Sequence, residues 1–227
     1  FARLGLGHCA WRFDVTVRAL CDPNVGQLSM TNQMDAHLIE TKLKGQALFS
    51  GSFLHAFLDT VALPDGTEAT REYVVHPGAV MIVPLLEKPG QPMQLVMERQ
   101  FRYPVQQVML EFPAGKLDPN ESTLQCAQRE LFEETGYSAK QWARAGVMHP
   151  VIAYSTEFIE IWFAKDLSLG ERQLDQGEFL EVITKTPEAL QEACLKGQVT
   201  DGKTLTGMFW LQNYLSGRHQ LNWVNAA

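Results

Sequence analysis

Four side chains able to build a metal site fall within six consecutive residues: Arg129, Glu130, Glu133 and Glu134. On a helix that turns about 100° per residue, Glu130 and Glu134 lie one turn apart and Glu133 lies beside them. Three carboxylates in the last turn are unfavourable, because the helix dipole is negative there. A divalent cation would remove the conflict, since Mg²⁺ prefers hard carboxylate oxygens. A solvated acidic helix end is the alternative interpretation.

The surrounding residues predict the helix that would hold these carboxylates. Leu124, Ala127 and Leu131 recur at helical spacing on another side, so an apolar stripe can pack against a core. Gly136 then suits the left-handed residue that ends many helices.

The wider spacing carries a family resemblance. Five residues separate Gly115 from Glu121, seven more precede Arg129-Glu130, and Glu133-Glu134-Thr135-Gly136-Tyr137 follows. The stretch resembles the Nudix box, G-x5-E-x7-R-E-U-x-E-E-x-G-U with U apolar, at every fixed position. Nudix hydrolases cleave a nucleoside diphosphate linked to another moiety, so the resemblance implies this reaction and the Nudix fold.

The composition limits the choice of partners. The chain has 227 residues, 45% of them hydrophobic, which is enough for one substantial core. A net charge of −7 argues against nucleic acid or an anionic membrane as the main partner, but one local cleft can still bind phosphate. Four scattered cysteines favour a reducing cytoplasm. No run reaches the roughly 18 apolar residues that span a bilayer, and no signal peptide is expected.

Turn signals and periodicity divide the chain into four parts. Residues 1–40 are expected to be an N-terminal extension of unknown role, for which disorder is one option, and 41–77 are expected to be strands around the Pro64–Thr67 turn. In residues 78–217 strands flank a central helix and further helices follow, which predicts an α/β sandwich. The resemblance implies the Nudix fold, an α/β/α sandwich with a mixed sheet, preceded by a small N-terminal β-meander. Residues 218–227 form the expected C-terminal tail.

Residues 197–204 fit a second pattern, G-x4-G-K-[ST], the phosphate-binding P-loop. That motif needs a preceding strand, whereas the preceding segment has helical spacing. We therefore interpret 197–204 as a loop between two helices.

Segments outside the box resemble the ADP-ribose pyrophosphatase branch of the family. They are DTVALPDGTEATREYVVHPGAV, ERQFRYPVQQVMLEFPAGKLD and the strand after LDQGEFLEV. The resemblance implies hydrolysis of ADP-ribose to AMP and ribose 5-phosphate with two or three Mg²⁺ ions, for which Mn²⁺ is a possible substitute. It also implies a homodimer in which the 41–77 strands help to bind the nucleoside.

The resemblance also implies roles for single residues. The metal ligands would be Glu130, Glu133, Glu134 and the backbone carbonyl of Ala114, with water positioning as the alternative for Glu133. Arg129 would orient the glutamates through charge-assisted hydrogen bonds, and Glu121 would support Arg129.

The remaining roles concern the substrate. Arg102, with Arg99 and Arg71, would bind the diphosphate, and Phe53 would stack on the adenine. Glu178 would be the general base, and Glu157 is the alternative.

One departure from the branch leaves the substrate open. Ile152 and Ala153 stand where the branch has a Pro-Gly turn, although Pro150 is kept. Another nucleotide sugar or a dinucleotide is therefore an alternative substrate. A nucleotide-sugar sensor without catalysis is the alternative from another class.

Overall fold

The computed structural model describes residues 35–174 and 176–226 of the chain. Their contacts divide into two compact units. One unit is Thr60–Ala69 with the described residues up to Lys44, and the other is Gly45–Asp59 with the described part of Thr70–Ala227. Residues 1–34 of the expected extension 1–40 lie outside the described residues.

The strands expected in 41–77 are present. After a short 3-10 helix η1 (Ala36–Leu38), β1 (Thr41–Ser50), β2 (His55–Ala62) and β3 (Glu68–Val75) form a sheet in that order. The turn at Pro64–Thr67 is confirmed: Asp65 accepts from the Thr67 amide at 2.9 Å, and Gly66 has φ 85°. A role of this sheet in dimerisation and nucleoside binding stays a prediction.

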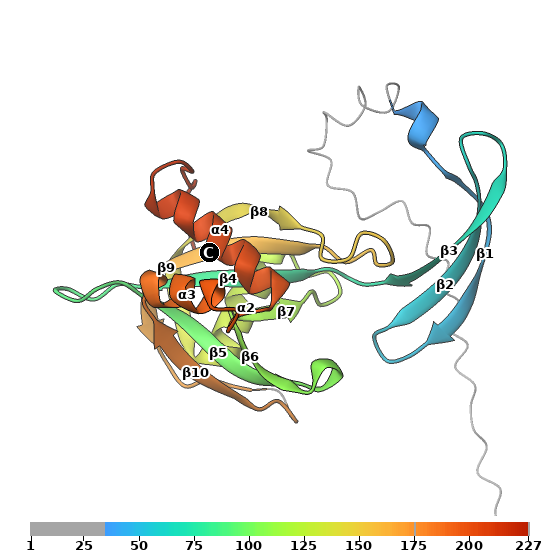
Figure 1. Cartoon of the computed structure of the whole chain (residues 1–227). Helices are drawn as coiled ribbons and strands as arrows, with labels where there is room; N and C mark the ends of the chain where they lie inside the picture. Colours follow the sequence, from blue (N-terminus) through green and yellow to red (C-terminus); the bar gives the residue numbers. More distant parts are fainter. Residues whose placement is uncertain (1–34, 175, 227) are drawn as a thin grey trace, which may run out of the picture. The chain divides into compact units, whose positions relative to one another are not determined.

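A mixed sheet forms the main fold, as the sequence predicts. In the described part of the chain it has eight strands, with the order β10-β5-β4-β9-β8-β11, while β6 pairs with β5 and β7 with β4 (Figure 1). The pairing of β4 with β9 is parallel, and the other pairings are antiparallel. The bounds are β4 (Ala79–Leu86), β5 (Gln94–Arg102), β6 (Gln107–Glu111), β7 (Ala114–Lys116), β8 (Tyr137–Met148), β9 (Ile159–Leu169), β10 (Leu180–Lys185) and β11 (Val224–Asn225).

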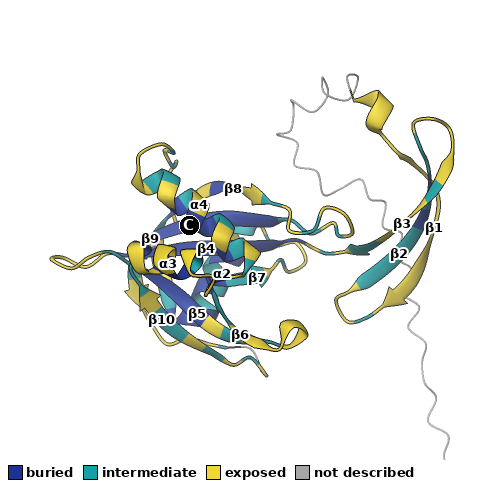
Figure 2. Cartoon of the chain, in the orientation of Figure 1, coloured by how far each residue is buried: buried dark blue, intermediate teal, exposed yellow. Residues whose placement is uncertain are grey.

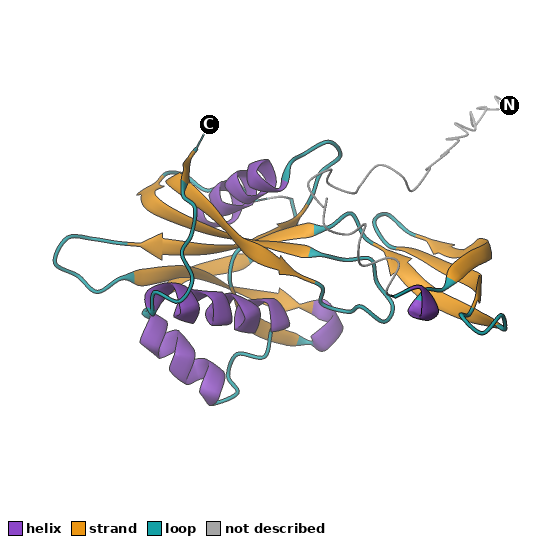
Figure 3. Cartoon of the chain, turned by 90° about the horizontal axis from the view of Figure 1, so that it is seen from above, coloured by secondary structure: helices purple, strands orange, loops and turns teal. Residues whose placement is uncertain are grey.

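Helices cover both faces of this sheet (Figure 3). Successive side chains of a strand point to opposite faces, so a central strand must be apolar on both. All eight residues of β4 are accordingly buried (Figure 2). Val80 and Ile82 pack with α2 (Thr123–Thr135), whereas Met81 and Val83 pack with α3 (Pro187–Leu195) and α4 (Gly202–Leu215).

Local signals fix the ends of α2. The Ser122 side chain accepts from the Gln125 amide while the Gln125 side chain accepts from the Ser122 amide, which is a capping box. Gly136 ends the helix with φ 76°, as its sequence position predicts. Ala127 and Leu131 are buried against the sheet, so the apolar stripe is confirmed.

The 197–204 stretch joins two helices, as expected, and α4 begins within it at Gly202. The element before it is α3 rather than a strand, which excludes a P-loop here. Among the described residues, no helix is both long and apolar enough to cross a membrane.

Candidate active site

Arg129 lies at the centre of the carboxylate cluster. Its guanidinium donates to both oxygens of Glu121 at 2.8 and 2.9 Å, to Glu130 at 2.7 Å and to Glu133 at 3.0 Å. It also donates to the Lys116 carbonyl at 3.1 Å, which links α2 to β7. The expected support of Arg129 by Glu121 is therefore present.

Glu121 reaches Arg129 because it precedes the helix instead of continuing it. It lies before the Ser122 cap, and its carboxylate also accepts from the Asp118 amide at 3.1 Å. The hydrogen bonds from Arg129 lower the pKa of Glu121 to about 2, so it is ionised at neutral pH.

Glu130 needs a glycine opposite its carboxyl group. A Cβ atom added at Gly115 would lie 1.9 Å from both the carboxyl carbon and Oε1 of Glu130. The first glycine of the box therefore allows close approach of β7 to α2.

Burial sets the electrostatics of the helix end. It raises the pKa of Glu130 to about 7, with Glu133 and Glu178 adding to the effect and Arg129 opposing it. Burial also raises the pKa of Glu134 well above its usual range, and the charges of Glu98, Glu130 and Glu178 add to this. The Ala114 amide donates to Glu134 at 3.1 Å, which fixes this side chain beside β7. The cluster is thus short of positive charge.

Two acidic residues near the cluster were missed by the sequence analysis. Glu98 on β5 is completely buried, and its carboxyl group lies within hydrogen-bonding reach of the carboxyl group of Glu134. Burial, and then the charge of Glu111, raise the pKa of Glu98 to about 8. The only signal in the sequence is an acid placed directly after the apolar run Leu95–Met97.

Glu111 is the second missed residue, and it binds one of the predicted substrate residues. Arg102 donates to it from Nε at 2.8 Å and from Nη2 at 2.9 Å, and Lys203 contacts the same carboxylate. Burial alone would raise the pKa of Glu111, but these two cations hold it below its usual value.

The two candidate bases differ in their surroundings. Glu178 accepts from Gln100 at 3.4 Å, and its charge acts on both Glu130 and Glu134. Glu157 instead lies 3.8 Å from His76 Nε2. The structure therefore brings Glu178, rather than Glu157, to the box carboxylates.

Of the other predicted substrate residues, Phe53 lies beside the box, whereas Arg99 and Arg71 do not join the carboxylate cluster. Arg99 projects from β5 on the face opposite Arg102 and pairs with Glu181 at 2.7 Å, so it does not join the cluster. Arg71 is exposed on β3 and donates to the Thr70 carbonyl at 2.8 Å. The Nζ atom of Lys116, the second residue of the box, lies over the ring of Phe53 at 4.4 Å from the ring centroid.

The donor set fits a divalent cation, because several carboxylates lie together with an excess of negative charge and Glu134 is buried. In residues 35–174 and 176–226, no group of three acidic, histidine or cysteine side chains could hold a metal ion as it stands. Arg129 and the Ala114 amide each donate to this cluster, and they engage one carboxylate oxygen of Glu130, of Glu133 and of Glu134.

Comparisons with known proteins agree with the fold and with the family resemblance. The family model described as the NUDIX domain matches residues 75–205. The chain is 34% identical over 177 residues to an ADP-ribose pyrophosphatase of Bacillus subtilis (strain 168), covering 77% of this chain and 94% of that protein. It is 33% identical over 185 residues to a methanol dehydrogenase activator of Bacillus methanolicus, covering 80% of this chain and 97% of the relative.

A solved structure described as an ADP compounds hydrolase also matches, with a TM-score of 0.70 and 22% identity over 80% of this chain and 97% of that chain. This likeness shows the shared fold. The chain belongs to the Nudix domain family. It is a hydrolase of that family, and the predicted Nudix fold is confirmed.

Proposed function

We propose that the chain hydrolyses the diphosphate bond of ADP-ribose, or of a related nucleoside diphosphate sugar, in a reaction that needs Mg²⁺, with Mn²⁺ as a substitute. The observation that carries the proposal is the set of box carboxylates arranged around Arg129. The relative of Bacillus subtilis named ADP-ribose pyrophosphatase supports the choice of substrate class.

In this proposal Glu130, Glu133, Glu134 and the Ala114 carbonyl hold the cations. Bound Mg²⁺ supplies neutralisation of the diphosphate oxygens and activation of a water molecule. Arg129 keeps Glu130 and Glu133 in place, because its guanidinium bonds both.

The other groups act on the substrate. Arg102 binds a phosphate oxygen, and Phe53 stacks on the adenine. The water oxygen forms a bond to one phosphorus while the bond from phosphorus to the bridging oxygen breaks, and Glu178 takes the water proton. The products are AMP and ribose 5-phosphate. A cytoplasmic location and a homodimer built through the 41–77 strands belong to the same proposal.

Product analysis tests this function. Wild-type protein, ADP-ribose and Mg²⁺ should give AMP and ribose 5-phosphate, and EDTA should stop the reaction. Turnover of other nucleotide sugars or dinucleotides, but not of ADP-ribose, would assign one of those compounds as the substrate instead. Binding without turnover across such a panel would favour a sensor.

A further inference from the structure

Lys203 is a charged residue that the proposed reaction does not use. It belongs to the G-x4-G-K-T stretch, yet it lies in the first turn of α4. Its side chain is only 15% exposed, and its ammonium contacts the carboxylates of Glu111 and of Asp201, the latter at 3.1 Å. Lysine is rarely buried to this extent unless it is paired, and here two carboxylates pair with it.

The position of Lys203 is fixed by the residues around it. Asp201 caps α4 and accepts from the Thr204 hydroxyl at 2.7 Å. The Thr204 hydroxyl, completely buried, accepts from the Phe112 amide at 3.1 Å. Because Phe112 follows Glu111 directly, the start of α4 is held against the chain that leads into the box.

Glu111 is shared by two cations. Its side chain is 2% exposed, and Arg102 and Lys203 both donate to it. The two bonds from Arg102 use two of the five N–H groups of a guanidinium and fix its plane. Three N–H groups remain on a side chain that is 39% exposed, so Arg102 can still bind an anion.

The charges of this group explain why a second cation is needed. Arg102 and Lys203 balance Glu111 and Asp201. Without Lys203, the three remaining side chains Arg102, Glu111 and Asp201 would carry one net negative charge. That charge would oppose a diphosphate in a partly buried, weakly screened site.

We propose that Lys203 is a positioning residue for the substrate diphosphate: by sharing Glu111 with Arg102, it leaves Arg102 able to bind phosphate oxygens. This inference rests on the proposed function and assigns a role to the P-loop-like stretch. Lys203 touches Glu111 and not the reacting atoms, so it acts on substrate binding.

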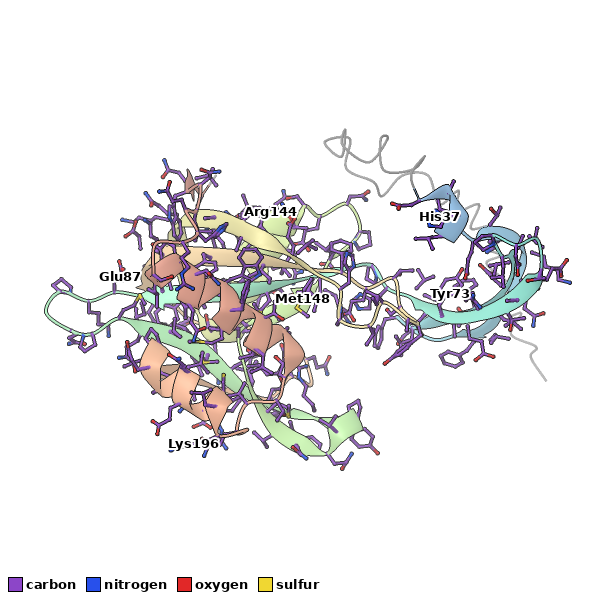
Figure 4. All side chains as sticks on the ribbon, turned by 45° about the horizontal axis from the view of Figure 1, so that its top comes forward. His37, Tyr73, Glu87, Arg144, Met148 and Lys196 are labelled. Carbon is purple, nitrogen blue, oxygen red and sulfur yellow. The ribbon has the colours of Figure 1, made fainter. Side chains whose placement is uncertain are left out.

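Steady-state kinetics with ADP-ribose and Mg²⁺ test the inference. Lys203→Met should raise KM about tenfold, the loss expected for one charged interaction, and change kcat by less than about threefold. Lys203→Arg keeps the charge and should restore most of the affinity. Lys196→Met is the matched control, because Lys196 is an exposed lysine that forms an ion pair with Glu192 of α3 (Figure 4). The KM of this variant should not change.

The Glu111→Gln background separates charge sharing from a merely structural role. If Lys203 acts through Glu111, Lys203→Met should raise KM much less in Glu111→Gln than in the wild type. A thermal melt checks folding of each variant, and Lys203→Gln replaces Lys203→Met if the latter does not fold.

An unchanged KM in folded Lys203→Met or Lys203→Gln, or an equal effect in both backgrounds, would overturn the inference. Absence of turnover in the wild type would instead contradict the proposed function, so the two failures are distinguishable.

Discussion

Glu98 and Glu111 lie directly opposite each other on the antiparallel strands β5 and β6, and both are almost completely buried. Like charges at such a pair are destabilising. The structure resolves the conflict in two ways. Glu111 stays ionised between Arg102 and Lys203, while burial and Glu111 favour the neutral form of Glu98 by raising its pKa. The pair therefore carries about one negative charge at neutral pH.

Replacing Glu98 by Gln should stabilise the metal-free protein at alkaline pH. The folded pKa of Glu98 is about 8 and the usual value is 4.5, so the folded state holds the proton more tightly. Its contribution is complete below pH 4.5 and is lost as the pH rises through 8. Denaturant unfolding in EDTA should show Glu98→Gln gaining on the wild type by about 4 kcal/mol between pH 5 and 9, which is the change that a pKa shift from 4.5 to about 8 implies. A constant difference across this range would contradict the assignment.

Glu121 gives the opposite dependence on pH. Its pKa is about 2 in the folded state against a usual 4.5, so its bonds to Arg129 contribute stability above pH 4.5 that is lost as the pH falls towards 2. Glu121→Gln should be less stable than the wild type at pH 6, and the difference in free energy of unfolding should shrink at pH 3. Equal stability of the two proteins at pH 6 would show that these bonds contribute nothing.

Gly115→Ala tests the close approach of β7 to α2. The new methyl group would overlap the Glu130 carboxyl group, so Glu130 should move, and the Mg²⁺ concentration needed for half-maximal activity should rise about tenfold or more. Gly202→Ala is the matched control, because nothing lies within 4 Å of its added Cβ and its φ is not positive. Equal Mg²⁺ dependence of the two variants would contradict the role of Gly115.

The general base is tested by comparing two single variants. Glu178→Gln should lower kcat about a hundredfold or more, as expected when a general base is lost. Glu157→Gln should have a much smaller effect, because Glu157 lies beside His76 rather than at the box carboxylates. The reverse order would assign the base to Glu157.

Much of the site follows from local sequence. The spacing of the box predicts that Arg129 lies among Glu121, Glu130 and Glu133, because one helix and its preceding loop fix these distances. Gly136 is predicted for the same reason, since helix ends follow local rules.

Other features depend on pairings between distant segments. The contact of Glu98 with Glu111 requires the register of β5 and β6, and that of Lys203 with Glu111 joins residues 92 positions apart. The two-residue strand β11 lies in the segment that was expected to be a tail, and it pairs with the edge of β8. No local pattern in the sequence predicts this strand. The separation of Arg99 from Arg102 is local by contrast, because two residues three positions apart on one strand lie on opposite faces of the sheet.

The central claim is that the carboxylates at the end of α2 support Mg²⁺-dependent hydrolysis, and Glu134→Gln tests it most directly. Initial rates of AMP formation from ADP-ribose should be measured across a Mg²⁺ series for the wild type, Glu134→Gln and Glu87→Gln. Glu87 is the matched control, since it is an exposed glutamate just after β4 (Figure 4).

We predict that Glu134→Gln lowers the rate at least about a hundredfold, because metal-assisted charge stabilisation contributes several kcal/mol. Glu87→Gln should match the wild type, and thermal melts should show both variants folded. A folded Glu134→Gln protein with wild-type turnover and Mg²⁺ dependence would contradict the account.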